Sequence, residues 1–541
     1  MLNSANKRLL LSFLPIVLII AFPLAMRKPA EAIDTEADQL VIVSPHNESI
    51  RYEFEQAFRK YYHEKTGRKV SIDWRATGGT SDIVRYINSA FTSNFKVYWT
   101  KELNQPWSDE VAAAFMNRKM KATDHPARKA YLESNLGIDI DIFFGGGQYD
   151  FNKQAQMGTI VPSGFKSRHP ELFEGDDPIL VEKRGGEIWY DKNDCYYGAC
   201  FSSFGICVNR DRAEKLGLDP DTFFSKWSAL GDPRLLNAIA VADPSKSGSI
   251  NKCFEMLVQR EMLDTMAALQ PQLDSGAITK QEALNRGWQN AMTLIKRIGG
   301  NSRYMTFSAS KIPVDCASAQ IATGMCIDFY GRSQAEWEET HVGRKTMMYT
   351  TPVASSSVSC DPIGIFRGAP HRERAELFMD FVMSKEGQLL WNNRLGSEGG
   401  PIKYSLNRLP VRHDLYTDEY RKNMTAPEAA PFELANAFTY HGEWTGPYFD
   451  LLRNTIKVMV IDCEEELKAA WTAIVKNGGP EKCPEAMAAF QAMPYDHAQA
   501  SEAATLLYTP ETQTKTMREW GDFFRENYRK ATRLAIKTNN N

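Results

Sequence analysis

Apolar residues in this chain occur in short β-rich runs that alternate with segments of helical periodicity. Residues 40–43 form an apolar run typical of a buried strand, and residues 49–65 place apolar side chains on one helical face. Gly67 follows as a helix-ending residue, and residues 70–74 are typical of a second strand. A further helix and a strand at 138–144 complete a β-α-β-α-β order, which predicts a parallel, doubly wound α/β sheet.

The same alternation recurs later in the chain. It predicts strands at 204–208, 239–242, 325–329 and 363–366, with helices at 250–269 and 372–390. Residues 92–135 interrupt the first set as a charged, helical insertion. Residues 411–541 have no strong strand signal and are predicted to be mostly helical.

Two α/β sets without a flexible linker predict two doubly wound lobes around a central ligand cleft. We expect residues 33–190 and 355–410 to form the first lobe and residues 191–354 the second, with 411–541 as a helical C-terminal extension. Ligands in such sheets bind beyond the carboxyl ends of the strands.

The N-terminus has the features of an export signal. Lys7 and Arg8 precede an apolar run over 9–26, and Ala30-Glu31-Ala32 matches a cleavage site. The run is also at the lower length limit of a membrane-spanning helix, so residues 1–32 are either a cleaved signal peptide or an uncleaved anchor. We expect cleavage and a periplasmic location, with a membrane tether as the alternative.

Composition argues against nucleic acid as a partner, but it does not decide whether the cysteines form disulfides. The 541 residues carry a formal net charge of −3, which offers no electrostatic reason for nucleic-acid binding. Nine cysteines fit an oxidising compartment. Cys195 and Cys200 are close enough in sequence to suggest a small disulfide loop, the alternative being that several of the cysteines are buried, inert thiols.

Small and hydroxyl residues gather at three predicted helix starts, where unpaired backbone N–H groups make anion sites. The candidate ligand-binding residues there are Gly79, Thr80, Ser81, Gly146, Gly147, Ser247, Gly248 and Ser249. Ordinary helix capping and tight turns are the alternative explanation for each loop taken alone. Their recurrence in successive α/β units favours a shared cleft.

Candidate metal ligands are sparse, and the signatures of known enzymes are weak. His46 follows the first strand and Tyr330 follows the strand predicted at 325–329, so the two could contribute to a site for a hard metal ion. No G-x-S-x-G, Walker A or H-E-x-x-H motif occurs, and we therefore expect no enzyme activity.

The ordered segments resemble those of the type II periplasmic solute-binding proteins of ABC importers. The resemblance is to the branch that binds ferric iron, thiamine and phosphorylated sugars. It covers about residues 40–410 and is carried by residues 41–46, 141–147, 243–249 and 375–388, of which the last contains the run S-K-E-G-Q. The insertion and the C-terminal extension fall outside it.

The resemblance implies a two-lobed clamp that acts as a monomer and delivers its ligand to a membrane permease. Iron-binding members use a histidine, a glutamate and two tyrosines. Here His46 matches the histidine, Gly145 or Gly146 stands in place of the glutamate, and only Tyr330 of Phe329-Tyr330 can serve as a tyrosine. We therefore expect a small anionic solute, such as a phosphate ester or another oxyanion, and no cofactor.

Two alternatives remain open for the function. In the first, the transported ligand is ferric ion, held by His46 and Tyr330. In the second, the clamp is the ligand-sensing module of a signalling complex, which would account for the long C-terminal extension.

Overall fold

The computed structural model describes residues 37–538. The predicted signal peptide or anchor at 1–32 lies outside the described residues. Between residues 37 and 538, no helix is both long enough and apolar enough to cross a membrane.

The first lobe is built on a seven-stranded sheet. Its path is β2 (Val70–Arg75), β1 (Asp38–Val43), β3 (Ile142–Phe144), β13 (Ser359–Phe366), β7 (Tyr196–Ser202) and β14 (Leu409–Pro410), with β4 (Ile160–Val161) paired to β13. β2, β1 and β3 are parallel, as predicted, whereas β13 runs antiparallel to β3. The reversal arises because β13 enters this sheet from the second lobe.

The second lobe has a five-stranded sheet of the same design. Its order is β10 (Ser302–Thr306), β9 (Ile239–Ala242), β11 (Thr323–Ile327), β8 (Phe204–Asn209) and β12 (Met347–Thr350). Three parallel strands are again followed by an antiparallel one, β8, which arrives from the first lobe. The prediction of two α/β lobes is confirmed, but each sheet is mixed rather than wholly parallel.

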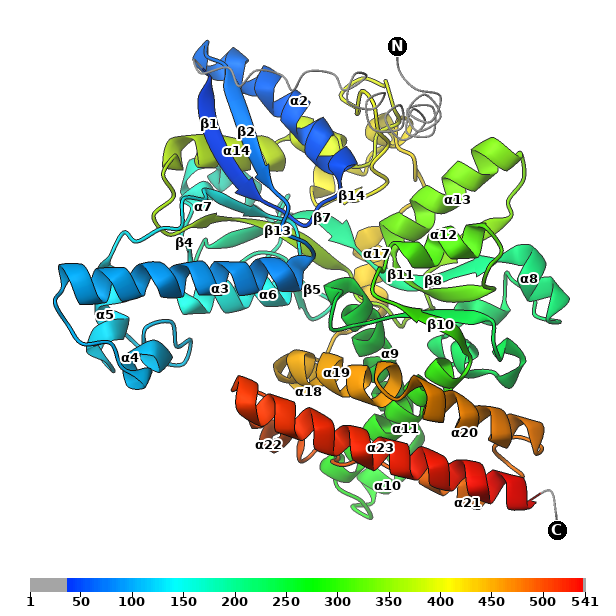
Figure 1. Ribbon diagram of the computed structural model, residues 1–541. Coiled ribbons are helices and arrows are strands. Elements are labelled where there is room, and N and C mark those ends of the chain that lie inside the picture. The colour runs from blue at the N-terminus through cyan, green and yellow to red at the C-terminus, as the bar shows by residue number, and fades with distance from the viewer. Residues whose placement is uncertain (1–36, 539–541) are drawn as a thin grey trace, which may run out of the picture.

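Helices cover the first sheet and form the insertion (Figure 1). They are α2 (Glu48–Thr66), α3 (Thr80–Val97), α4 (Asp109–Ala114), α5 (Pro126–Glu133), α6 (Gln148–Met157), α7 (Phe165–Arg168), α14 (Arg372–Met383), α15 (Lys385–Leu389), α16 (Asp418–Arg421) and α17 (Pro431–Ala437). Local sequence explains their ends. The Asn47 side chain accepts a hydrogen bond from Ile50 N at the start of α2, and Gly67 ends that helix at φ 70°.

The second lobe carries α8 (Arg210–Lys215), α9 (Gly248–Ala268), α10 (Gln270–Asp274), α11 (Lys280–Gly300), α12 (Lys311–Ala317) and α13 (Asp328–Val342). The C-terminal helices are α18 (Gly442–Thr445), α19 (Phe449–Ile456), α20 (Glu464–Lys476), α21 (Pro484–Phe490), α22 (Ala500–Thr505) and α23 (Pro510–Thr538). Figure 1 shows these orange and red helices lying against α9 and α11. Trp471, Phe490 and Tyr528 are buried in the same core as β9 and β11, so the extension, mostly helical as predicted, completes the second lobe.

The chain crosses between the lobes three times. The first crossing is at Ser203, between β7 and β8, rather than near residue 190 as predicted, because β7 pairs within the first sheet. The second lies between β12 and β13, where the predicted boundary falls. The third follows α17, since Ala435 packs in the first core and Phe438 in the second.

The suggested disulfide between Cys195 and Cys200 does not form. All nine cysteines have buried free thiols. Cys195 directly precedes β7 and Cys200 lies within it. An extended chain rises about 3.3 Å per residue, so these Cα atoms are much farther apart than the roughly 7 Å that a disulfide tolerates. The alternative of buried thiols is the correct one.

Candidate functional site

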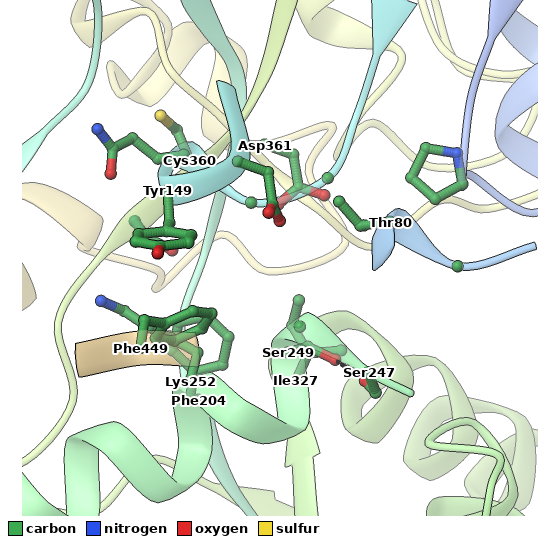
Figure 2. Close-up of a pocket in the computed structure, with 18 of the residues that line it drawn as sticks. Thr80, Tyr149, Phe204, Ser247, Ser249, Lys252, Ile327, Cys360, Asp361 and Phe449 are labelled. Carbon is green, nitrogen blue, oxygen red and sulfur yellow. Dashed lines mark hydrogen bonds between the residues drawn. The ribbon is translucent and has the colours of Figure 1, made fainter. Parts of the chain in front are cut away.

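A cavity of about 790 Å³ lies between the two lobes. Figure 2 shows Thr80, Tyr149 and Asp361 of the first lobe on one side of it, facing Ser247, Ser249 and Lys252 of the second lobe. Because residues of both lobes form its walls, opening or closing the lobes changes the cavity directly.

Three helices that follow parallel strands begin at the cavity wall. α3 and α6 start there in the first lobe, and α9 starts there in the second. The first N–H groups of a helix have no acceptor within the helix and carry its positive dipole end. Ser247 caps α9 by accepting a hydrogen bond from Ile250 N at 3.3 Å, and its hydroxyl lies 3.0 Å from that of Ser249. The arrangement suits a ligand that carries negative charge.

Of the residues predicted to bind ligand, all except Ser81 line this cavity. They are His46, Gly79, Thr80, Gly146, Gly147, Ser247, Gly248, Ser249 and Tyr330. Ser81 is buried, and its hydroxyl accepts a hydrogen bond from Arg453 Nη1 at 3.0 Å. The predicted loops therefore meet at one cavity, whereas the Ser81 side chain is turned to a partner in the C-terminal segment.

Two glycines permit close packing at the cavity wall. A Cβ atom on Gly79 would lie 3.2 Å from the backbone oxygen of Lys246, across the interlobe boundary. Gly146 has φ +114°, and a Cβ atom there would lie 2.9 Å from Thr80 Cγ2. The loops of the two lobes therefore approach each other at backbone distance, which indicates a closed arrangement.

His46 is neutral and has an unpaired ring nitrogen. Its side chain is buried, and within residues 37–538 its Nε2 atom has no hydrogen-bond partner. Burial and then the neighbouring Arg408 lower the pKa of His46 to about 3. The Nε2 atom faces Gly145, where a Cβ atom would lie 2.3 Å from it.

Arg408 is a cavity residue that the sequence does not reveal. Its guanidinium is buried, and it donates hydrogen bonds to Asp361 Oδ2 at 2.8 Å and Ser202 Oγ at 2.5 Å. Burial alone would lower the pKa of Arg408, but Asp361 raises it above its ordinary value. Its Nε atom has no partner in the described part of the chain. No motif marks this arginine, because it reaches the cavity from a loop just before β14.

The lobes also touch on both sides of the cavity. On one side, Tyr149 Oη donates to Asp450 Oδ2 at 3.0 Å, and Lys153 Nζ lies 3.3 Å from the same oxygen. On the other side, Asn407 Nδ2 donates to Glu336 Oε2 at 2.6 Å. Burial would raise the pKa of Asp450, but Arg453 and then Lys153 hold it below its ordinary value. The C-terminal segment thus supplies part of the interlobe contact.

A second polar group lies farther along the cavity. Lys252 Nζ is 2.8 Å from both Glu187 Oε1 and Glu255 Oε2. Glu255 Oε1 also accepts hydrogen bonds from Tyr440 Oη at 2.7 Å and Thr445 Oγ1 at 2.6 Å. Sequence reasoning did not find this group because its members come from β6 (Glu187–Ile188), which pairs with β5 (Lys183–Arg184), from α9 and from the third crossing.

The two candidate iron ligands are both present at the cavity without further support. His46 and Tyr330 line it, but among residues 37–538 no group of three or more histidine, cysteine, aspartate or glutamate side chains is placed to hold a metal ion. Burial raises the pKa of Tyr330, which disfavours the tyrosinate that ferric iron requires.

Comparison with known proteins gives distant similarities. No protein-family model matches the chain. An uncharacterized protein of Haemophilus influenzae is 24% identical over 292 residues, covering 50% of this chain and 68% of that protein.

Solved structures with a similar arrangement are periplasmic or transporter-associated binding proteins. The fructose-6-phosphate-bound periplasmic binding protein AfuA of Actinobacillus pleuropneumoniae is 17% identical, with 65% of this chain and 82% of that chain covered and a TM-score of 0.42. The apo ferric ion-binding protein A of Pasteurella haemolytica is 12% identical, covering 79% and 98%, with a TM-score of 0.44. The spermidine/putrescine-binding protein PotD of Streptococcus pneumoniae is 14% identical, covering 77% and 100%, with a TM-score of 0.42.

At these identities and TM-scores, the similarities do not identify the ligand of this chain. The strand orders do describe the architecture: in each lobe, three parallel strands are followed by an antiparallel strand that has crossed from the other lobe. The chain therefore has a two-lobed α/β fold with a cavity between the lobes.

Proposed function

We propose that this chain is the periplasmic solute-binding component of an ABC import system and captures a small anionic solute, such as a phosphate ester or another oxyanion. The observation that carries the proposal is the interlobe cavity at which α3, α6 and α9 begin. Helix starts from two separate lobes converge there, and an anion between them would gain contacts that exist only when the lobes are closed.

The anion would be held mainly by backbone N–H groups and hydroxyls. Thr80 and Ser249 lie in the first turns of α3 and α9, on opposite sides of the cavity. His46 and Arg408 line the same cavity and would supply further contacts. Arg408 would orient the ligand by a directional hydrogen bond and add little net positive charge, because its guanidinium is already paired with the Asp361 carboxylate.

Delivery to a membrane permease would use the closed state. A ligand that contacts both lobes stabilises the closed arrangement in proportion to its extra affinity for that state. The contacts of Asp450 with Tyr149 and Lys153 form in the same arrangement. A permease that binds only the closed surface would therefore distinguish loaded from free protein.

The test is calorimetric titration of the purified mature protein with inorganic phosphate, fructose 6-phosphate, ferric citrate and spermidine. Binding of phosphate or the phosphate ester supports the proposal. Binding of ferric citrate with a visible charge-transfer band that is lost in Tyr330→Phe would replace it with the ferric alternative. Copurification with a sensor kinase rather than a permease would favour the signalling alternative.

A double substitution then tests the site itself. Thr80→Ala with Ser247→Ala removes one hydroxyl from each side of the cavity, and we expect phosphate-ester affinity to fall about 10- to 100-fold without unfolding. The matched control is Thr92→Ala with Ser108→Ala, since Thr92 is also in α3 and Ser108 caps α4 as Ser247 caps α9. Affinity equal to that of the wild type in both double variants would exclude the Thr80 and Ser247 hydroxyls as ligand contacts.

A further inference from the structure

The second polar group of the cavity consists of Lys252, Glu187 and Glu255. All three line the cavity, and the two glutamates are 3% and 1% exposed. We propose that this group binds a cationic nitrogen of the ligand, so that the solute is a zwitterion with a phosphate-like anion at one end and an ammonium at the other. This inference rests on the proposed function, which places the anion at the helix starts.

Lys252 cannot itself be the contact for a ligand anion. A lysine ammonium has three N–H donors. Two face Glu187 and Glu255 at 2.8 Å each, and the ammonium lies 3.9 Å from the centre of the Tyr440 ring. Burial alone would lower the pKa of Lys252, but the two carboxylates raise it above its ordinary value, so the ammonium stays charged and fully used.

The group contains more carboxylates than ammonium groups. Two glutamates and one lysine give this group a net charge of −1. Glu187 Oε1 accepts from the Ser357 hydroxyl at 2.5 Å and lies 2.8 Å from Lys252 Nζ. Glu255 Oε2 has the Lys252 ammonium at 2.8 Å as its partner. A buried charge that is only partly satisfied calls for a further cation.

The distance between the two ends defines the size of the ligand. Gly248, Lys252 and Glu255 lie on one face of α9, and all three line the cavity. At 1.5 Å per residue, Lys252 and Glu255 are about 6 and 10 Å from the start of that helix. The anion and the ammonium would therefore be separated by roughly this distance, which a phosphorylated six-carbon skeleton spans. The rings of Tyr149, Phe204 and Phe449 also line the cavity and give it apolar wall.

The decisive experiment compares two ligands that differ in one group. Glucosamine 6-phosphate and glucose 6-phosphate share their skeleton and phosphate, but the first carries an ammonium where the second carries a hydroxyl. By calorimetry at pH 6.5, we expect the wild-type protein to bind the amino sugar about tenfold or more tightly. In Glu187→Gln the preference should fall to about threefold or less, because the local charge becomes zero.

Controls separate charge from folding. Glu182→Gln makes the same change at an exposed position outside the cavity and should keep the wild-type preference. If Glu187→Gln fails to fold, Glu255→Gln tests the same charge from the second lobe. The comparison of the two sugar phosphates on the wild-type protein tests the zwitterion without either variant.

Each outcome decides a different claim. Equal binding of the two sugars, or tighter binding of glucose 6-phosphate, overturns the zwitterion and leaves the anion clamp standing. Binding of inorganic phosphate without either sugar also overturns it, because the organic part would then be excluded. Failure of all three probes, inorganic phosphate included, overturns the proposed anion site and this inference with it.

Discussion

Replacing Arg408 with methionine should destabilise the first lobe and weaken anion binding together. The guanidinium is 1% exposed, and its partner Asp361 is 16% exposed. Arg408→Met fills most of the volume but leaves the Asp361 carboxylate buried without its cation. Breaking a buried pair in this way costs about 3 to 5 kcal/mol. We expect about 3 kcal/mol, the lower end of this range, since Ser202 still donates to Asp361 Oδ1 at 2.9 Å.

Equilibrium urea unfolding measures the loss, and hydrogen exchange of the β13 amides reports it within the first lobe. Adding Asp361→Asn to Arg408→Met should recover about 2 kcal/mol, because a neutral amide replaces the orphaned charge. It should not recover affinity for the phosphate probe. The matched control is Arg75→Met, which breaks an exposed pair with Asp73 and should change stability by less than about 0.5 kcal/mol. An Arg408→Met protein within 1 kcal/mol of wild type would refute the reasoning about the buried pair.

Two further predictions concern the neutral histidine and the interlobe contacts. Because the folded pKa of His46, about 3, lies below its ordinary 6.5, the unfolded chain takes up a proton first as the pH falls. Stability should then drop below pH 6.5 by up to about 1.4 kcal/mol per pH unit relative to His46→Gln. An imidazole that titrates near pH 6.5 by NMR would contradict this. Asp450→Asn weakens the contacts with Tyr149 and Lys153, so X-ray scattering should show a larger radius of gyration and ligand affinity should fall several-fold. An unchanged radius of gyration and ligand affinity would show that the C-terminal segment does not contribute to closing the lobes.

Local patterns predicted the elements well where a helix or strand follows from its own residues. Gly67 ends α2 and the loop around Gly79 begins α3, as the sequence indicates. The crossings were harder to locate. β7 is an apolar run like any other strand, and only its pairing with β13 assigns it to the first lobe. Strand direction could not be predicted either, because β7 is buried along its whole length and shows the continuous apolar run that is also typical of a parallel strand.

The residues of the cavity likewise fall into those that the sequence predicts and those that it does not. The glycine and hydroxyl loops are visible in the sequence because each is local to one strand-helix connection. Arg408, Glu187 and Lys252 are not, since each lies in an unremarkable segment and gains its role from a partner far away in the chain. Ser81 shows the opposite error, because a side chain that is suited to a ligand is occupied by Arg453.

The sequence by itself determined the two α/β lobes, the helix starts that meet between them and the neutral balance of charge. These follow from periodicity, capping residues and composition, all of which act over a few residues. Tertiary structure alone decided that the C-terminal helices complete the second lobe and contact the first through Asp450 and Arg453. It also decided that one cavity contains both helix starts and a buried excess of carboxylate, because electrostatic pairing depends on distance in space and not on distance along the chain.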